Sequence, residues 1–280
     1  MLPTMGNAFG SPLTNAVARQ YDLFQQSLET MEKERKYLNY GYTVDGDEPI
    51  EARQQRLCLE VFRAAGIAAN HVVVDVGFGS GEQDFLLARG FEFTRLVGFN
   101  VSGRQVRYAA ERAVREKLDH KLTFCLGEAE TLPGLEDASV DRLVAVECAF
   151  YFDRPRFYRR AAQVLKPDGL LVLADIQLSD RLAFLTRRED LRRVGTVSGN
   201  RRAWERDFRA RSIRNISRHT RPGVQMTVWQ ILKTAPFGRF TIAQRREWLK
   251  MACYSQLVAL GLWLELLTYD LLVFEKISGR

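Results

Sequence analysis

The sequence has few of the residues and patterns that would assign it to a common protein class. Its four cysteines (Cys58, Cys125, Cys148 and Cys253) are scattered without a C-x-x-C pair, so we predict no disulfide framework and no metal site. No apolar run approaches the ~18 residues of a membrane span. Residues 1–13 also lack the charged and then apolar pattern of a signal peptide. These absences favour a globular protein of a reducing cytoplasm, without membrane contact.

Histidine is scarce, and positive charge is unevenly spread. The 280 residues include three histidines, which leaves few candidates for an imidazole base. Residues 181–221 contain thirteen arginines and no lysine against four acidic residues, so this segment carries a charge of +9. The whole chain carries +7, which leaves −2 for the remainder. The basic character therefore belongs to one segment.

Strands and helices alternate through the middle of the chain, which is typical of a parallel sheet covered on both faces. Apolar runs predict strands at 71–76, 95–99, 122–126, 140–146 and 170–176, with a last strand at 269–276. Helical spacing predicts helices at 14–37, 51–65, 82–88, 102–116, 154–165 and 243–260. Gly66 is the expected stop of the second helix, and Ser102 is the expected N-cap of the fourth.

The most informative stretch is residues 72–81, which read VVVDVGFGSG. A buried strand is followed by alternating glycines and then a helix, so free backbone N–H groups can face an electron-rich ligand there. The nicotinamide and flavin fingerprint G-x-G-x-x-G/A needs a small sixth residue. Counting from Gly77, that position is Glu82. The spacing therefore disfavours a dinucleotide cofactor.

The pattern D-x-G-x-G-x-G, formed by Asp75, Gly77, Gly79 and Gly81, resembles the first motif of class I S-adenosylmethionine (AdoMet) dependent methyltransferases. The resemblance covers residues 72–176. It implies that the three glycines wrap the methionine end of AdoMet and that the aspartate orients it. The product would be S-adenosylhomocysteine.

Later segments carry the same resemblance in the same order. Asn100 ends the second strand in a G-x-N-x-S pattern, where a polar side chain can take the ribose hydroxyls. Glu128 and Ala129 follow the third strand, and the resemblance implies that they hold the adenine amino group. Residues 161–169, AAQVLKPDG, are similar to the family's R-V-L-K-P-G-G turn before strand five. The remaining predicted cofactor contacts are Val101, Gln105, Glu147 and Tyr21.

We therefore expect an α/β fold: a Rossmann-like three-layer sandwich with a mostly parallel seven-stranded sheet whose last strand is antiparallel, plus a helical lid. Residues 1–66 would form an N-terminal helical lid, and residues 67–178 the AdoMet-binding core. Residues 179–244 would form an arginine-rich cap over the cleft. Residues 245–280 would complete the core with a helix and a strand.

The catalytic residues are harder to predict. A hydroxyl acceptor must lose a proton, so a base within hydrogen-bond reach helps. Many similar natural-product O-methyltransferases carry histidine just after the acid that ends strand four, but this sequence has Phe150 and Tyr151 there. Asp175, at the carboxyl end of strand five, is our first candidate, because an aspartate at this place often assists the acceptor in similar methyltransferases. His219 is the second, and Tyr151 and Glu147 follow.

The acceptor pocket would come from the segments outside the core. Its predicted aromatic lining is Tyr21, Tyr40, Tyr42, Trp204 and Trp229. The arginine-rich segment allows four interpretations: a solvated surface, recognition of an anionic or carrier-bound acceptor, RNA contact, or a membrane face. No RNA-binding module and no clear amphipathic helix accompany it, which disfavours nucleic acid and membrane.

The resemblance implies a methyltransferase acting on a small natural-product-like acceptor. O-methylation is favoured over C- and N-methylation. Two alternatives stay open: a protein that keeps the cofactor fold for binding or for a non-methylating rearrangement, and an RNA methyltransferase. The sequence is compatible with an oligomer.

Overall fold

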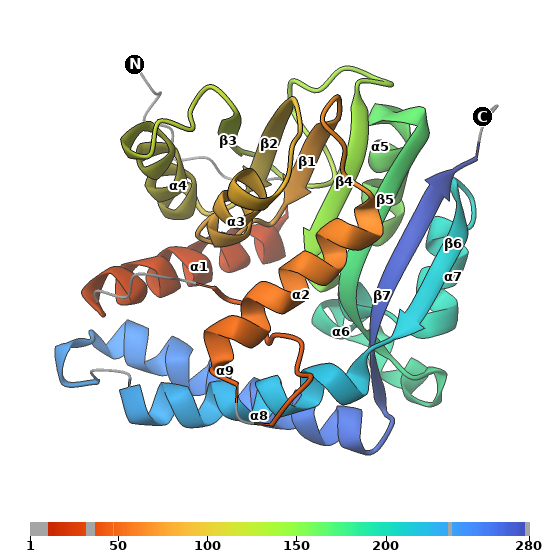
Figure 1. Cartoon of the computed structure of the whole chain (residues 1–280). Coiled ribbons are helices and arrows are strands. Elements are labelled where there is room, and N and C mark those ends of the chain that lie inside the picture. The colour runs from red at the N-terminus through yellow and green to blue at the C-terminus, as the bar shows by residue number, and fades with distance from the viewer. Residues whose placement is uncertain (1–10, 32–36, 47, 235–236, 278–280) are drawn as a thin grey trace.

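The computed structural model describes residues 11–31, 37–46, 48–234 and 237–277, and it is built around one seven-stranded sheet (Figure 1). The strands are β1 (Val72–Val76), β2 (Arg95–Asn100), β3 (Leu122–Leu126), β4 (Val140–Val146), β5 (Leu165–Leu178), β6 (Phe208–Asn215) and β7 (Leu267–Lys276). Their order is β3-β2-β1-β4-β5-β7-β6. β1 to β5 pair in parallel, and β7 is antiparallel to β5 and β6. The predicted fold class is confirmed.

Helices cover both faces of the sheet and the carboxyl ends of its parallel strands. They are α1 (Pro12–Thr30), α2 (Ile50–Ala65), α3 (Glu82–Gly90), α4 (Gly103–Arg115), α5 (Arg154–Val164), α6 (Glu189–Val194), α7 (Val197–Trp204), α8 (Ser217–Thr234) and α9 (Ile242–Trp263). Short 3-10 helices lie at η1 (Ala149–Tyr151), η2 (Asp180–Arg187) and η3 (Phe237–Arg239).

The predicted helix boundaries have clear local causes. Gly66 follows α2 in the left-handed conformation, with φ of 57°. The Ser102 hydroxyl accepts the backbone N–H of Gln105 and caps α4. The first helix is shorter than predicted, since it ends at Thr30, and its predicted part over 32–36 lies outside the described residues.

Two strands differ from the prediction. β5 begins at Leu165, five residues earlier than expected, with residues 166–169 forming an irregularity between two strand pairs. β6 was not predicted at all, and it lies inside the segment expected to be only a cap. Its sequence, FRARSIRN, has no apolar run because β6 is an edge strand and most of its side chains are exposed.

Apolar side chains fill both faces of the sheet, as expected for parallel strands. On one face, α2, α3, α8 and α9 pack around residues such as Phe62, Phe85 and Leu262. On the other face, α5 and α7 pack around Phe157, Tyr158 and Trp204. Trp204 is buried in this second core, where its ring packs at an angle against Phe274 of β7, and it lines neither cavity described for this structure.

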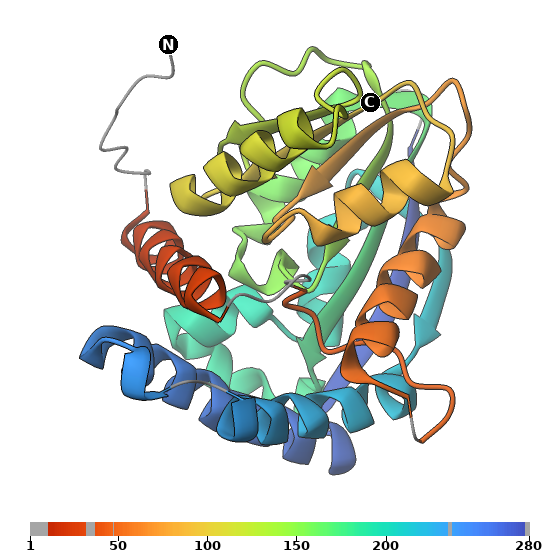
Figure 2. The ribbon, with the colours of Figure 1, turned by 60° about the vertical axis from the view of Figure 1, so that its left-hand side comes forward.

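The lid is formed by α1, α8 and α9, which lie beneath the carboxyl ends of the parallel strands (Figure 1). Figure 2 shows α1 beside α4, with the paired α8 and α9 below it. A capping box between Thr241 and Gln244 starts α9. Phe24 of α1 and Trp248 of α9 then meet in a small apolar cluster. These contacts join α1 to α9 over the carboxyl ends of the parallel strands.

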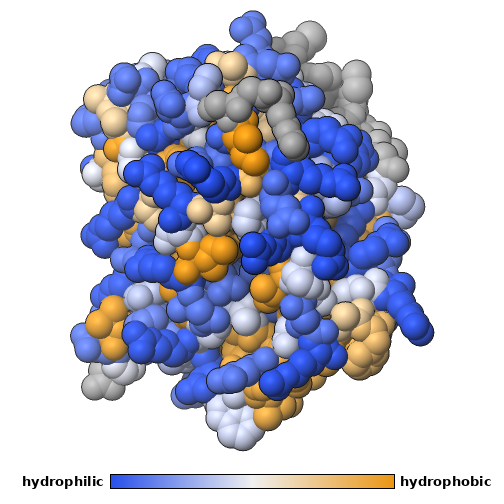
Figure 3. Space-filling model, turned by 90° about the vertical axis from the view of Figure 1, so that its right-hand side faces the viewer, coloured by the Kyte–Doolittle hydropathy of each residue, from blue (hydrophilic) through white to orange (hydrophobic). Residues whose placement is uncertain are grey.

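The surface over β6 and α7 is mainly hydrophilic, and apolar side chains gather toward its lower edge (Figure 3). Exposed large apolar residues are concentrated on α9, where Leu249, Leu257, Leu260 and Trp263 are each at least half exposed. Among the described residues, no helix combines the length and apolarity needed to cross a membrane.

A buried ion pair attaches the arginine-rich segment to the sheet. Asp175 of β5 is fully buried, and its Oδ2 accepts a hydrogen bond from Arg154 Nη1 at 2.6 Å. The same guanidinium donates to the backbone carbonyls of Arg193 and Val194, in α6. Burial raises the pKa of the Asp175 carboxyl, and the arginine opposes that rise. The pair thus holds α6 against β5.

We expect Asp175→Asn to destabilise the fold, because it leaves the buried Arg154 cation without its counter-charge. Removing one partner of a buried pair costs about 3–5 kcal/mol, and urea unfolding would measure this loss. The control is Asp137→Asn, whose exposed pair with Arg160 contributes about 0–1 kcal/mol. Equal losses in the two variants would contradict the structural role.

Candidate functional site

The three loop glycines have distinct structural reasons. Gly77, Gly79 and Gly81 all have positive φ, at 73°, 61° and 81°. A Cβ on Gly77 would lie 2.7 Å from Cys148, and one on Gly81 would lie 3.1 Å from Ala109, so both permit close packing. A Cβ on Gly79 would meet only Leu38 at 3.5 Å. Gly79 therefore has no packing partner that requires a glycine, and its backbone lies where it can approach a ligand in the cavity that it lines.

Asp75 supports this loop from behind. It is fully buried on β1, and Gln83 Nε2 donates to its Oδ2 at 2.5 Å. Burial raises the pKa of Asp75 to about 6, and burial beside Asp75 raises the pKa of Asp84 well above its ordinary value. Two adjacent buried carboxyl groups resist carrying two charges. The pair therefore holds a proton. Asp75 itself lies behind the glycine loop and lines neither the narrow cavity in front of this loop nor the larger cavity under the lid.

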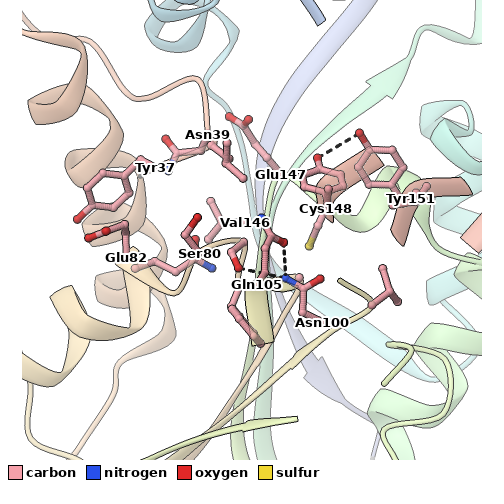
Figure 4. A pocket seen from close by; sticks show the side chains of 18 of the residues that line it. Tyr37, Asn39, Ser80, Glu82, Asn100, Gln105, Val146, Glu147, Cys148 and Tyr151 are labelled. Atoms are coloured by element: carbon pink, nitrogen blue, oxygen red, sulfur yellow. Dashed lines mark hydrogen bonds between the residues drawn. The ribbon is translucent and has the colours of Figure 1, made fainter. Parts of the chain in front are cut away.

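A narrow cavity opens in front of the loop (Figure 4), and three of the predicted cofactor contacts, Asn100, Val101 and Gln105, line it. Asn100 Nδ2 donates to the carbonyl of Gly79 at 3.2 Å and to Gln105 Oε1 at 2.8 Å. Gln105 Nε2 is buried and has no hydrogen-bond partner among the described residues. This unpaired donor needs a polar ligand atom, because an unsatisfied buried N–H is costly.

The predicted adenine contacts lie outside this cavity. Glu128 and Ala129 follow β3 and are not among its lining residues. Their neighbour Glu130 accepts the backbone N–H of Asp153 at 2.7 Å instead. The adenine-binding role of Glu128 and Ala129 stays a prediction.

A second cavity of about 1040 Å³ lies between the sheet edge and the lid. Its walls are mainly apolar side chains of α1, η2, α6 and α9, including Leu182, Leu185, Leu191, Leu257 and Leu260. This volume is at the upper end of ligand pockets, which span roughly 300–1,000 Å³. The cavity can therefore take a large, apolar molecule.

The two cavities meet at a small set of side chains. Both are lined by Val17, Tyr21, Tyr37, Leu38, Asn39, Glu147 and Tyr151. Glu147 is the one carboxylate in this shared set, and Figure 4 shows it beside Asn39 at the end of β4. A group that moves from one cavity to the other would pass these residues.

Glu147 is held in a strained and buried position. Its φ is +54°, which is uncommon for a residue with a side chain and is found at functional sites. The hydroxyl of Tyr269 donates to Glu147 Oε1 at 2.5 Å. The backbone N–H of Tyr40 lies 2.9 Å from Oε1 and 3.0 Å from Oε2. Burial raises the pKa of Glu147 to about 8, although both donors oppose the rise.

Tyr21 and Tyr151 are a second pair of polar side chains at the junction, since both line the two cavities. Their hydroxyl oxygens are 3.2 Å apart, and their rings meet edge to face (Figure 4). Burial raises the pKa of both phenols, so they stay neutral at physiological pH. The pair can orient a ligand and exclude water.

Other predicted residues lie away from the cavities. His219 stacks on Tyr42, and its Nδ1 is 2.9 Å from the carbonyl of Thr43, so it attaches α8 to the loop before α2. Trp229 is exposed on α8. Asp175 lines neither cavity, because it faces Arg154. Tyr40 does line the large cavity.

The arginine-rich segment contributes little to the site. Of its thirteen arginines, Arg188 is the one among the lining residues of the large cavity, and it pairs with Asp190. Arg193 donates to the Tyr151 carbonyl at 2.6 Å and thereby positions η1. The described arginines Arg201, Arg209 and Arg214 pair with nearby glutamates. This arrangement favours a structural and solvated role for the segment.

The sequence analysis missed Tyr269, Asp84 and Ser80 as parts of the site. Ser80 lines the narrow cavity and donates to Gln25 of α1 at 2.7 Å. Tyr269 and Asp84 occur in a strand and a helix that read as ordinary core elements. Asp84 could have been predicted from the sequence, because it is a charged residue on the buried face of α3. No group of three or more His, Cys, Asp or Glu that could hold a metal ion occurs among the described residues.

The core of the chain is similar to known methyltransferases. Residues 74–173 match the family described as "Methyltransferase domain". The chain is 39% identical over 158 residues to erythromycin 3''-O-methyltransferase of Saccharopolyspora erythraea, covering 56% of this chain and 51% of that protein. It is 31% identical over 168 residues to 27-O-demethylrifamycin SV methyltransferase of Amycolatopsis mediterranei, covering 60% of each. The chain thus spans about half to three fifths of these curated relatives.

Two solved structures share the fold over nearly the whole chain. One is the [4+2]-cyclase SpnF, with 21% identity and a TM-score of 0.79 over 98% of this chain and 100% of that one. The other is geranyl diphosphate C-methyltransferase from Streptomyces coelicolor A3(2), solved with Mg²⁺, geranyl diphosphate and S-adenosyl-L-homocysteine. It has 16% identity and a TM-score of 0.72 over 96% and 100% of the two chains. Residues 74–173 thus match a methyltransferase domain, and the chain has the seven-stranded fold of class I AdoMet-dependent methyltransferases.

Proposed function

We propose that this protein transfers a methyl group from AdoMet to a hydroxyl of a large, mainly apolar natural-product acceptor. The observation that carries the proposal is the position of Glu147, where the narrow cavity of the glycine loop meets the large apolar cavity. Cofactor and acceptor would meet at this carboxylate. Its buried setting gives it a pKa suited to taking a hydroxyl proton near neutral pH.

The relatives support an oxygen acceptor. One is named as a 3''-O-methyltransferase of erythromycin, and another as a methyltransferase of 27-O-demethylrifamycin SV. The 1040 Å³ cavity between the sheet and the lid has room for a large acceptor. The names of the two relatives support the proposed class of acceptor, and the size of the cavity supports this class independently.

The residues of the narrow cavity fit AdoMet. The backbone at Gly79 would approach its methionine part, and the unpaired Gln105 Nε2 would find an acceptor atom on the ligand. Asn100, which also lines this cavity, would meet the ribose. Bound AdoMet supplies an activated methyl group on a sulfonium, so the protein must mainly align the acceptor and exclude water.

In this scheme Glu147 removes the proton of the acceptor hydroxyl as the oxygen–carbon bond forms and the carbon–sulfur bond breaks. The electron pair of the broken bond stays on sulfur, and the proton stays on the carboxyl group until it is released to solvent. Tyr21 and Tyr151 remain neutral and close the junction against water. The burial of Glu147, at a junction that the large and mainly apolar cavity shares, strengthens its electrostatic effect.

Gly79→Val tests the cofactor cavity. We expect AdoMet affinity to fall at least ~10-fold, because the new side chain would both strain a residue with φ of 61° and occupy the ligand's space. Isothermal titration with AdoMet and S-adenosylhomocysteine measures this. Gly134→Val is the matched control, since Gly134 also has positive φ (80°) but lies in open space outside the cavity. Unchanged AdoMet affinity in Gly79→Val would show that the cofactor does not bind against Gly79 in the narrow cavity.

Glu147→Gln tests the base. We expect AdoMet binding to persist while turnover of a hydroxyl acceptor falls ~10²–10⁴-fold, the usual contribution of a general base. The wild-type kcat/KM for AdoMet should rise with pH on an acid limb centred near 8, because the base must be ionised. Labelled-methyl transfer into an extract containing the acceptor, followed by mass spectrometry, measures both. Wild-type turnover in Glu147→Gln would remove this residue from the mechanism.

The structural likeness to a [4+2]-cyclase keeps a non-methylating role as the second candidate, because the same fold serves a cyclisation there. The two roles differ in product. AdoMet binding with no labelled methyl in any extract component would favour the second role. Label recovered in RNA would instead favour the third alternative, an RNA methyltransferase.

A further inference from the structure

Tyr269 is a buried residue that touches the central carboxylate without touching either cavity. It lies near the start of β7, opposite Ile176 of β5, and it has no exposed surface. Its backbone N–H donates to Ser217 Oγ at 2.9 Å, and its carbonyl accepts the N–H of Ile216 at 2.7 Å. The ring is therefore fixed at the junction of β7 and α8, with its hydroxyl directed at Glu147.

The two oxygens of Glu147 are not equivalent. Oε1 accepts the Tyr269 hydroxyl at 2.5 Å and also the N–H of Tyr40 at 2.9 Å. Oε2 shares only that same N–H, at 3.0 Å. A carboxylate oxygen with two donors is less basic and less free to receive a proton than one that shares a single donor.

We propose that Tyr269 is a positioning residue of the site: its hydroxyl occupies Glu147 Oε1 and leaves Oε2 as the atom that takes the acceptor proton. This inference rests on the proposed function. Tyr269 keeps its own proton throughout, since burial next to a carboxylate raises the pKa of its phenol well above the ordinary value. Its donated hydrogen bond stabilises the ionised form of Glu147, which is the form that acts as a base.

Among the residues that the structure describes, Tyr269 is the group around Glu147 that is suited to this task. The titratable side chains that act on it are Tyr40, Cys58, Cys148, Tyr151, Asp175 and Tyr269. Burial raises the pKa of each of these tyrosines and cysteines, so they stay neutral where Glu147 titrates. Asp175 is matched by the buried Arg154. Tyr269 is the one of them whose side chain donates a hydrogen bond to the Glu147 carboxylate.

The test is the pH dependence of kcat/KM for AdoMet in Tyr269→Phe, which keeps the ring and removes the donor. A hydrogen bond to a charged group contributes about 1.5–3 kcal/mol. Because 1.36 kcal/mol is one pKa unit, we expect the acid limb to move upward by about 1 unit or more. Activity should return to within a few-fold of the wild type above the shifted limb. Tyr42→Phe is the control, since Tyr42 lines neither cavity and contacts His219 instead.

Two outcomes would overturn the inference. An acid limb at the wild-type position in Tyr269→Phe would show that the hydroxyl does not act on the base. An equal loss of activity at every pH, with no shift, would show that Tyr269 only supports the core. The proposed function fails separately, if Glu147→Gln keeps wild-type turnover. Loss of turnover in Glu147→Gln with an unshifted Tyr269→Phe would reject the role of Tyr269 alone.

Discussion

The site depends on the carboxylate of Glu147, a buried residue with a strained backbone whose side chain accepts hydrogen bonds from two donors. Glu147 has a positive φ at the end of β4, and this backbone conformation directs it to the junction of two cavities. Burial alone would keep it protonated, whereas the Tyr269 hydroxyl and the Tyr40 N–H favour its charge. The balance leaves it able to change protonation near neutral pH. A carboxylate in water, at its ordinary pKa, would be a far weaker base.

The rest of the fold holds that junction together. β7 supplies Tyr269. Because β7 lies between β5 and β6 and runs antiparallel to both, its first residues lie at the edge of the sheet where β4 ends, and there the Tyr269 hydroxyl donates to Glu147. The Asp175–Arg154 pair holds α6 against β5, and Arg193 of α6 in turn binds the carbonyl of Tyr151. A buried ion pair that lines neither cavity can therefore influence the position of the junction. The stability of the insert and the geometry of the site are linked.

The sequence predicted the parts of the protein that are encoded locally. The strand and glycines at 72–81 have a periodicity and a spacing that suffice for the fold and the cofactor cavity. Asp175, by contrast, was predicted in the site from its place at the end of strand five and from the aspartate found there in similar methyltransferases, and no local pattern shows that Arg154 faces it. β6 was missed because an exposed edge strand needs no apolar run. Tyr269 acts 122 residues from Glu147, so no local pattern contains the pair.

The central claim is that Glu147 is a buried base with a strongly raised pKa, and a direct titration tests it without any acceptor. The protein is labelled with ¹³C at the glutamate carboxyl carbons, and its NMR spectrum is compared with that of Glu147→Gln to assign the resonance. The account predicts that this resonance titrates with a midpoint of about 8 in the ligand-free protein. A midpoint near the ordinary glutamate value of about 4.3 would contradict it.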